Sequence, residues 1–356
     1  MQNRSGEALE NAIDRVMTGC YKEGSFNGSA LVAHRGEIIY KKSFGYADRA
    51  WRVPNRPDTR FMLGSNTKQF TSLLVMQLVE KGLVRLDGEI SRYLPGFSGD
   101  LGSGITVRHL LTHTSGLPDL FHQPSFESGK PYQPHAIGRI NSGVTRDRLE
   151  FPPGSRFKYC NTGYCLLGNI IEEVTGKTYP EALRDNIMQP LGMQNSGYYD
   201  DGCSSVDFAR SYSYGERGLA PEEMLDSRAS FAAGNIYSTV EDMYLWDQAL
   251  YTDRLLSQRH REMLFTPYIG NYAFGWVRVD ISPGKIKEFM VDPLDYKSQG
   301  GENAVTCIVH RGKIAGFCTL ILRITNSRQL IVLLGNVFTP VFPEEIACDL
   351  LDQMDI

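Results

Sequence analysis

Hydrophobic residues near the two ends of the chain follow the pattern of β-strands. Close to the N-terminus, GSALVAH, the turn residues Arg35-Gly36 and EIIYKKSFG predict a β-hairpin. Close to the C-terminus, GFCTLILRI and LIVLLGNV predict a second hairpin around the polar turn TNSRQ. A helix, PEEIACDLLDQMD, follows, with Pro343 in its first turn. The simplest arrangement pairs both hairpins in one antiparallel sheet.

The middle of the chain instead has helical periodicity. TKQFTSLLVMQLVEKG has apolar residues at helical spacing and stops at Gly82. YCLLGNIIEEVTG and TVEDMYLWDQALY have the same period, and the second begins after the caps Ser238 and Thr239. We therefore expect an α/β fold, an antiparallel sheet flanked by helices, with a mostly helical lobe inserted. The expected cleft between the two lobes is the natural place for a functional site.

The lobes are assigned from this order of elements. Residues 1–62 and 265–356 form the expected discontinuous α/β lobe, and residues 63–264 form the helical lobe. Within the latter, residues 119–153 are rich in Pro, Gly, Ser and aromatic residues and show weak periodicity. Because loops of this length without secondary structure are uncommon in a compact domain, we interpret the segment as a functional lid or an insertion.

Composition narrows the classes of partner. The chain has 356 residues, 42% of them hydrophobic and 22% charged, and its formal net charge is −4. Since no run of Lys and Arg stands out, we expect neither nucleic acid nor an anionic membrane surface as a partner. No run of 18 apolar residues occurs, so we expect no membrane span. The start, MQNRSGEALENAID, lacks the apolar core of a signal peptide, which favours a cytoplasmic location unless a leader has been removed.

Cysteine and histidine spacing does not indicate a metal site. The seven cysteines form no C-x-x-C pair, and most have apolar neighbours, as in GFCTLIL. We interpret them as reduced, mostly buried thiols. His109 and His113 have ligand-like spacing in HLLTH, but the glutamate of the zinc motif H-E-x-x-H is missing. We expect no metal and no cofactor.

The pattern S-x-x-K, which can place a lysine beside a nucleophilic serine, occurs three times. SPGK at Ser282 has the residues of a turn, and SRFK at Ser155 follows two prolines and a glycine, which disfavour helical geometry. Only SNTK at Ser65 opens a strong amphipathic helix. Residues three apart share a helix face, so Lys68 can reach the Ser65 hydroxyl.

The position of this copy also favours nucleophilic chemistry. A helix N-terminus supplies free N–H groups and partial positive charge. Together with burial, this field destabilises an ammonium and turns Lys68 into a proton acceptor. The same N–H groups can help to stabilise an oxyanion. The alternative is structural, with Ser65 as an N-cap and Lys68 as a solvated residue.

Two further stretches hold candidate residues for the same cleft. In FKYCNTGY, Tyr159 could relay a proton to a leaving group and Asn161 could orient a substrate carbonyl. The alternatives are a packed tyrosine and a capping asparagine.

In IVHRGKIAGF we expect an edge strand along the cleft, on which His310 and Gly312 share a face. Gly312 would let a substrate approach the backbone, and the N–H of Lys313 could be a second oxyanion donor beside that of Ser65. Alternatively, His310 is an ordinary exposed strand residue.

The order S-x-x-K, Y-x-N, H-x-G resembles the serine β-lactamase and penicillin-binding-protein superfamily. The resemblance is to the branch with class C β-lactamases, D,D-carboxypeptidases, D-aminopeptidases and related esterases. It extends to FNGSALVAHRGEIIYKKSFGYAD, LDGEISRYLPGF, ITVRHLLTHTSGLPDL, AAGNIYSTVEDM and FGWVRV, which fall in the family's order. It implies the β-lactamase/transpeptidase-like fold. It also implies that Ser65 becomes acylated, that Lys68 and Tyr159 share the proton transfers, that Asn161 binds substrate, and that His310 takes the place of the lysine in K-T-G.

The third motif departs from the pattern of the family's β-lactamases. These usually carry Lys-Thr-Gly or Lys-Ser-Gly, where this chain has His310-Arg311-Gly312. The missing hydroxyl usually meets a substrate carboxylate. Arg311 could replace it as a bidentate anchor. Alternatively, Arg311 is an exposed cation at the rim, since strand alternation points it away from the face of His310.

We therefore expect a serine hydrolase that forms an acyl-enzyme at Ser65 and hydrolyses small esters or amides. The expected partner is a small-molecule ester, amide or D-peptide, with weak β-lactam hydrolysis as a possible side activity. The alternatives are a D,D-carboxypeptidase, penicillin-binding enzyme or β-lactamase, and an inert scaffold of the same fold. The chain contains no G-x-S-x-G, which excludes the nucleophile elbow of α/β-hydrolases.

Overall fold

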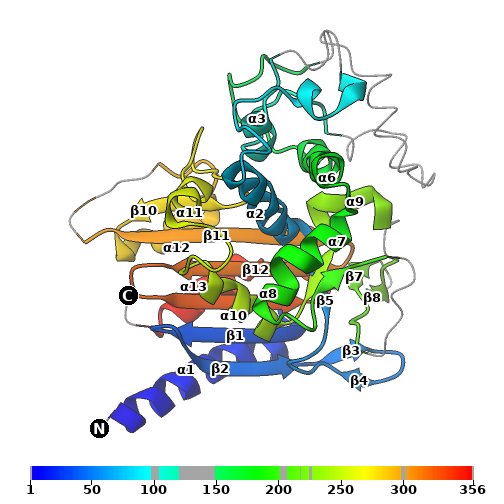
Figure 1. The fold of residues 1–356 in the computed structure, drawn as a ribbon. Helices are drawn as coiled ribbons and strands as arrows, with labels where there is room; N and C mark the ends of the chain where they lie inside the picture. Colours follow the sequence, from blue (N-terminus) through cyan, green and yellow to red (C-terminus); the bar gives the residue numbers. More distant parts are fainter. Residues whose placement is uncertain are drawn as a thin grey trace.

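A six-stranded antiparallel sheet forms the centre of the molecule, and both ends of the chain contribute to it (Figure 1). The computed structural model describes residues 2–97, 104–119, 149–200, 207–216, 218–223, 227–297, 301 and 303–354. The strand order is β10-β11-β12-β13-β1-β2. These strands are β1 (Gly28–His34), β2 (Glu37–Phe44), β10 (Val277–Ile281), β11 (Val305–Ile314), β12 (Phe317–Ile324) and β13 (Gln329–Gly335).

Both predicted hairpins form, and they pair with each other. The turn between β1 and β2 has φ 54° at Arg35 and 84° at Gly36, the left-handed conformation that a two-residue hairpin turn requires. β12 pairs with β13, and β13 pairs with β1 along almost its whole length. The predicted antiparallel sheet built from both ends of the chain is therefore confirmed.

Helices cover both faces of this sheet. Successive side chains of each strand point to opposite faces, so the strands contribute to two separate hydrophobic cores. Leu31 and Ala33 of β1 belong to one core, whereas Ala30 and Val32 belong to the other. The second core is closed by α1 (Gln2–Lys22), α12 (Ile286–Val291) and α13 (Pro343–Leu351). The first core is closed by α10 (Val240–Ala249) and by the helices around α2 (Thr67–Glu80).

The helix α2 is buried on every side, which corrects the amphipathic pattern predicted for it. All residues from Thr67 to Leu78 are buried, because the helix packs among α6 (Asn161–Thr175), α7 (Tyr179–Leu183), α9 (Ser227–Gly234) and α11 (Gln258–Leu264). Its polar side chains are hydrogen-bonded inside the protein. Gln69, for example, donates to Asn66 Oδ1 (2.7 Å) and accepts from Trp246 Nε1 (3.0 Å). The helix that carries Lys68 is thus a rigid central element.

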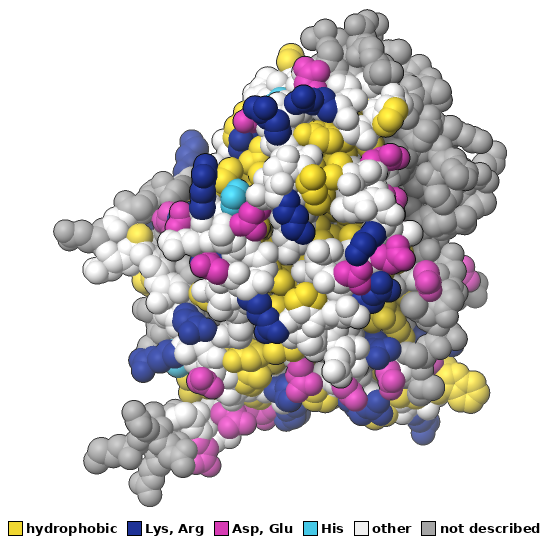
Figure 2. All heavy atoms as spheres, viewed as in Figure 1, with side chains coloured by type: hydrophobic (Ala, Val, Ile, Leu, Met, Phe, Trp, Pro, Cys, Tyr) yellow, Lys and Arg dark blue, Asp and Glu magenta, His cyan; other side chains and the backbone are white. Residues whose placement is uncertain are grey.

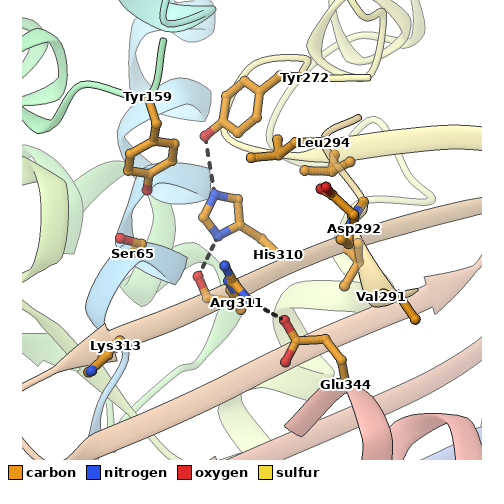
Figure 3. A pocket seen from close by; sticks show the side chains of 13 residues that line it. Ser65, Tyr159, Tyr272, Val291, Asp292, Leu294, His310, Arg311, Lys313 and Glu344 are labelled. Atoms are coloured by element: carbon orange, nitrogen blue, oxygen red, sulfur yellow. Dashed lines mark hydrogen bonds and ion pairs between the residues drawn. The ribbon is translucent and has the colours of Figure 1, made fainter. Parts of the chain in front are cut away.

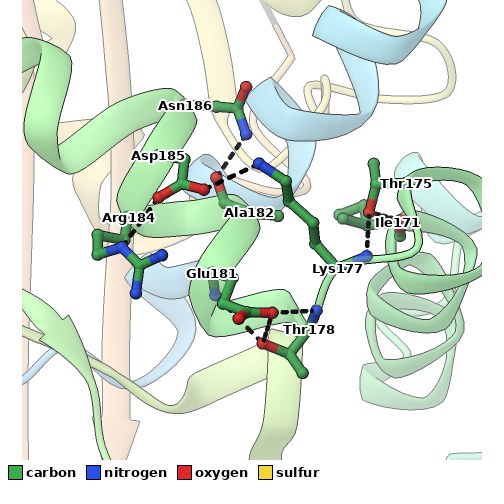
Figure 4. A network of polar contacts seen from close by, with 9 residues as sticks. All are labelled: Ile171, Thr175, Lys177, Thr178, Glu181, Ala182, Arg184, Asp185 and Asn186. Atoms are coloured by element: carbon green, nitrogen blue, oxygen red, sulfur yellow. Dashed lines mark hydrogen bonds and ion pairs between the residues drawn. The ribbon is translucent and has the colours of Figure 1, made fainter.

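Local hydrogen bonds set the ends of the helices around α2. The predicted cap of α10 is Thr239, whose hydroxyl accepts from Asp242 N (3.2 Å). The sequence did not indicate α7, which begins with a capping box (Figure 4). In this box Thr178 N donates to Glu181 Oε2 (2.9 Å) and Glu181 N donates to Thr178 Oγ1 (3.4 Å).

The strand that carries His310 differs from its prediction as an edge strand. β11 lies between β10 and β12, and β10 is the edge strand. However, β10 pairs only with residues 305–309, so residues 310–314 have β12 on one side and the 3₁₀ turn η1 (Gly64–Asn66) near the other. The strand β10 was not predicted, although its alternating sequence VRVDI carries a strand signal.

Shorter elements connect these layers: β3 (Tyr46–Asp48), β4 (Val53–Pro54), β5 (Phe61–Met62), η2 (Ile90–Arg92), η3 (Pro95–Phe97), α3 (Val107–Leu111), η6 (Arg184–Met188), α8 (Gln189–Leu191), β6 (Gly197–Tyr198), β7 (Tyr212–Gly215), β8 (Gly218–Pro221), β9 (Ile236–Ser238), α11 (Gln258–Leu264), η7 (Pro283–Lys285) and β14 (Val337–Phe338). Residues 120–148, most of the predicted lid, lie outside the described residues. The proposed division into two lobes stays a prediction.

The surface agrees with the small net charge of the chain. On the face shown in Figure 2, described basic and acidic side chains are interspersed, with small hydrophobic areas between them. Within the described residues, no helix combines the length and the hydrophobicity that crossing a membrane would need.

Candidate active site

Ser65 lies on η1, directly before α2 and beside β11. Two glycines allow this close packing. A Cβ at Gly64 would lie 2.8 Å from Lys313 N, and a Cβ at Gly312 would lie 1.9 Å from Leu63 O. We expected Gly312 to make room for a substrate, but the backbone that approaches it is the protein's own. A direct role of Gly312 in substrate binding stays a prediction.

The structural alternative for Ser65 and Lys68 does not fit. The N-cap position of α2 is occupied by Asn66 rather than Ser65. Lys68 has no exposed surface and is therefore not a solvated lysine. Its Nζ lies 3.0 Å from Ser65 Oγ, 2.8 Å from Asn161 Oδ1 and 2.9 Å from Ala233 O. The structure thus brings Ser65, Lys68 and Asn161 into one hydrogen-bonded group.

The protonation state of Lys68 decides what this group can do. Burial lowers the pKa of Lys68 to about 7. A neutral amine has two N–H donors and one lone pair. The Asn161 and Ala233 oxygens can only accept, so they take the two N–H donors, and the lone pair is left for the hydroxyl of Ser65. In this arrangement the lone pair of a neutral Lys68 can accept the Ser65 proton.

Asp119, which no sequence motif indicated, fixes the orientation of the Asn161 amide. Asp119 Oδ2 accepts from both Asn161 N (3.1 Å) and Asn161 Nδ2 (2.9 Å). Since a carboxylate accepts only, Nδ2 must face Asp119 and Oδ1 must face Lys68. Asp119 is itself buried, at 7% exposure. It follows HTSGLP, but a single acidic residue at the start of a loop gave no signal that distinguished it.

Tyr159 faces the same serine from the loop before α6. Figure 3 shows its hydroxyl directed toward Ser65. The hydroxyl oxygen is buried and has no hydrogen-bond partner among the described residues. Burial raises the pKa of Tyr159 above its ordinary value, and the nearby Ser65 hydroxyl opposes this shift only in part. The phenol is therefore protonated at neutral pH and available as a donor.

His310 is buried and uncharged, which differs from the lysine whose place it was expected to take. Burial, followed by the proximity of Lys68, lowers its pKa to about 3. Its Nδ1 donates to Arg311 O (2.7 Å), which leaves Nε2 as the acceptor for the Tyr272 hydroxyl at 3.1 Å (Figure 3). Both ring nitrogens are thus engaged by the protein. Tyr272 was not among the residues predicted for the site, and it holds the imidazole in place.

Arg311 points away from the buried face of β11, as strand alternation predicts. Its side chain is 64% exposed, and its Nη1 forms an ion pair with the nearly buried Glu344 at 3.1 Å. The positive charge that was considered as a carboxylate anchor is therefore already opposed by a carboxylate. Lys313 directs its ammonium group over the Phe338 ring, 3.6 Å from the centroid.

The other two S-x-x-K copies have different partners. Ser155 Oγ donates to Pro152 O (2.6 Å), and Lys158 forms an exposed ion pair with Glu150 (2.6 Å). The lysine of the third copy, Lys285, pairs with Glu288. Each of these lysines is exposed and paired with a carboxylate, so neither resembles the buried amine beside Ser65.

Two cavities lined by described residues open on Ser65. The larger one, about 390 Å³, is also lined by Tyr159, Leu294, His310, Arg311 and Glu344 (Figure 3). The smaller one, about 300 Å³, is also lined by Asn161, Glu222, Ala233 and Ala315. Lys313 borders both cavities. A molecule with its reacting atom at Ser65 could therefore extend in two directions.

Comparison with known proteins places this site in a family. The sequence model of the family described as Beta-lactamase matches residues 10–349. Penicillin-binding protein 4* of Bacillus subtilis (strain 168) is 31% identical over 335 residues, which cover 87% of this chain and 68% of that protein. Teichoic acid D-alanine hydrolase of Staphylococcus aureus (strain MRSA252) is 31% identical over 259 residues, which cover 73% of this chain and 59% of that protein.

A solved structure agrees with these sequences. The penicillin binding protein from Bacillus halodurans has a TM-score of 0.76 and 28% identity to this chain, and the alignment covers 96% of this chain and 98% of that one. The match to the family model includes η1, α2, the start of α6 and β11, which carry Ser65, Lys68, Asn161 and His310. The resemblance found in the sequence is confirmed: the chain belongs to the β-lactamase family and is a serine hydrolase of that family.

Proposed function

We propose that this protein hydrolyses small esters or amides through an acyl-enzyme formed on Ser65. The observation that carries the proposal is the buried amine of Lys68, which has Ser65 Oγ 3.0 Å away and acceptors on its other sides. A serine hydroxyl is a weak nucleophile until a base takes its proton. Neutral Lys68 takes that proton as Oγ bonds to the substrate carbonyl carbon, whose oxygen becomes the oxyanion. The N–H groups of Ser65 and Lys313 are the proposed donors to this oxyanion.

Tyr159 is the proposed acid for the leaving group. Its raised pKa keeps the phenol protonated, and its hydroxyl faces Ser65. When the bond to the leaving group breaks, Tyr159 gives that group its proton, and the ammonium of Lys68 replaces the proton on the phenol. Lys68 is then neutral again and can take a proton from the water that attacks the acyl-enzyme.

Small neutral esters and amides are favoured over substrates whose own carboxylate must be bound by the protein. His310 is neutral and the charge of Arg311 is opposed by Glu344. The other charged side chains that line the larger cavity, Lys313 and Asp292, are opposite in sign, so this cavity has no net positive charge. β-Lactams and D,D-peptides carry a carboxylate near the scissile amide, and its burial without a cationic partner is costly. The relative named teichoic acid D-alanine hydrolase is compatible with an aminoacyl substrate.

A substrate panel with mass detection tests this function. The same preparation is assayed with p-nitrophenyl acetate and butyrate, nitrocefin, and a D-alanyl-D-alanine peptide. We expect ester turnover at least about tenfold faster in kcat/KM than nitrocefin turnover. Intact-mass spectra should show one acyl group per chain, and peptide mapping should place it on Ser65. An acyl group mapped to another residue, or ester turnover without any adduct at high substrate, would contradict the proposal.

The negative charge of Asp119 should raise the pKa of Lys68, the proposed base. Burial lowers the pKa of Lys68, and Asp119 opposes that shift. The Asp119→Asn variant can still accept from Asn161 but lacks the negative charge. The ammonium of Lys68 is then less stable, its pKa falls, and the acidic limb of kcat/KM moves to lower pH. Asp119→Ala also loses the orientation of Asn161 and should lower kcat/KM by about tenfold or more.

Measured pH profiles separate these two effects of Asp119. The other described groups that act on or lie beside Lys68 are neutral side chains: Cys160, Cys165, His113, His310, Tyr159 and Tyr164. The matched control is Asp253→Asn, which removes an exposed carboxylate with an ion-pair partner on α11 and should leave the limb in place. An acidic limb that does not move in Asp119→Asn would show that Asp119 does not act on the base.

A further inference from the structure

The two cavities that meet at Ser65 divide a substrate into an acyl part and a leaving part. The acid that protonates the leaving atom must lie on the leaving side. Tyr159 lines the larger cavity, whereas Asn161 lines the smaller one. With the carbonyl oxygen between Ser65 N and Lys313 N, the leaving group therefore extends into the larger cavity and the acyl group into the smaller. At about 300 Å³, the smaller cavity suits a short acyl chain.

The smaller cavity contains a carboxylate that no described residue neutralises. Glu222 directly follows β8, and its backbone is fixed by two hydrogen bonds. Its N donates to Ser211 O (2.9 Å), and Ser211 Oγ donates to its carbonyl oxygen (2.9 Å). No hydrogen bond or ion pair of the Glu222 carboxylate occurs within the described residues. The side chain is half-buried at the cavity wall.

Neither lysine of the site compensates Glu222. Lys313 also borders the cavity, but its ammonium lies over the Phe338 ring at 3.6 Å. Lys68 is enclosed behind Asn161 and Ala233 and directs its N–H groups to their oxygens. The smaller cavity therefore presents a carboxylate next to backbone and small side chains. The chemical group that complements this carboxylate is a small cation with hydrogen-bond donors.

We propose that the smaller cavity selects acyl groups that carry a protonated amine, and that the Glu222 carboxylate binds this ammonium. The substrate class is then aminoacyl esters or amides with a free amino group, rather than simple fatty-acyl esters. This inference rests on the proposed acyl-enzyme chemistry at Ser65 and specifies its substrate. An ammonium is the group that complements this carboxylate, because it supplies a charge-assisted hydrogen bond that a neutral acyl substituent lacks, whereas an anionic substituent would be repelled.

Matched substrates with and without the amine test the assignment. The p-nitrophenyl esters of D-alanine, L-alanine and propionic acid share leaving group and acyl length, and only the alanyl esters carry an ammonium at neutral pH. The quantity measured is the ratio of kcat/KM for each alanyl ester to that for the propionyl ester, after subtraction of spontaneous hydrolysis. Intrinsic ester reactivity cancels when the ratio is compared between variants.

For Glu222→Gln we expect the higher of the two wild-type ratios to fall by about tenfold or more, as for loss of a charged hydrogen bond. For Glu222→Lys we expect a larger fall.

The neighbouring Glu223→Gln variant is the control. Glu223 is exposed, and its replacement removes the same charge, so the ratios should equal those of the wild type. Labelling of Ser65 by a fluorophosphonate shows that each variant is folded. Unchanged ratios in both Glu222 variants would overturn the inference while leaving the hydrolase function intact. If the wild type hydrolyses none of the three esters, the proposed function itself fails, and the inference fails with it.

Discussion

The Ser65→Ala variant is expected to lose ester hydrolysis almost completely, with kcat reduced by about 10⁶-fold, the scale seen when a catalytic serine nucleophile is removed. The reason is local. Of the described groups around the reacting position, only the Ser65 hydroxyl lies both against the lone pair of Lys68 and at the junction of the two cavities. Initial rates with p-nitrophenyl acetate and gel labelling with a fluorophosphonate measure the loss. The fold should remain, because Ser65 caps no helix.

A second serine provides the matched control for this variant. Ser155 has the same S-x-x-K spacing, but its hydroxyl donates to Pro152 O and its lysine pairs with Glu150. Ser155→Ala should therefore keep kcat within about twofold of the wild type. Normal labelling of Ser65→Ala, or an inactive Ser155→Ala, would show that the wrong serine was chosen.

The sheet could be predicted from the sequence because its signals are local. The left-handed turn at Arg35-Gly36 and the near-continuous apolar runs of β12 and β13 need no knowledge of distant residues. The burial of α2 could not be predicted in this way. Its Thr, Gln and Lys side chains suggest a solvated face, and they are buried only because neighbouring helices and Trp246 supply hydrogen-bond partners.

The residues of the candidate site show the same difference between local sequence signals and contacts that depend on distant residues. Ser65, Lys68, Tyr159 and Asn161 fall in short motifs with fixed spacing, so the sequence could indicate them together. Asp119 and Tyr272 are hydrogen-bonded to residues 38 or more positions away, and Glu222 lines a cavity made by several segments. Single polar residues in loops give no pattern in the sequence that would indicate such contacts. The neutral state of His310 likewise depends on burial, which only the assembled fold supplies.

The Lys68→Met variant is expected to lower kcat/KM by about 10³-fold, because methionine fills a similar space but cannot accept the Ser65 proton. In the wild type, kcat/KM should rise with pH and level off above about 7, where the lysine has lost its proton. The variant should lack this limb. Lys158→Met, in the second S-x-x-K copy, is the control and should keep both rate and profile. A Lys68→Met enzyme with wild-type rates would require another base.

Unfolding measurements test the neutral lysine without any substrate. Lys68 has a pKa of about 7 when folded and one near 10.5 when unfolded, so between these values the unfolded chain holds a proton that the folded chain lacks. Stability then rises with pH in this window, and this pH dependence vanishes well below pH 7, where both states are protonated. Relative to Lys68→Met, which has no such group, the wild type should gain about 1.4 kcal/mol of unfolding free energy per pH unit between about pH 8 and 9. Urea unfolding of both proteins across this range gives the slope directly, and parallel pH dependences would mean that Lys68 keeps its proton and is not the base.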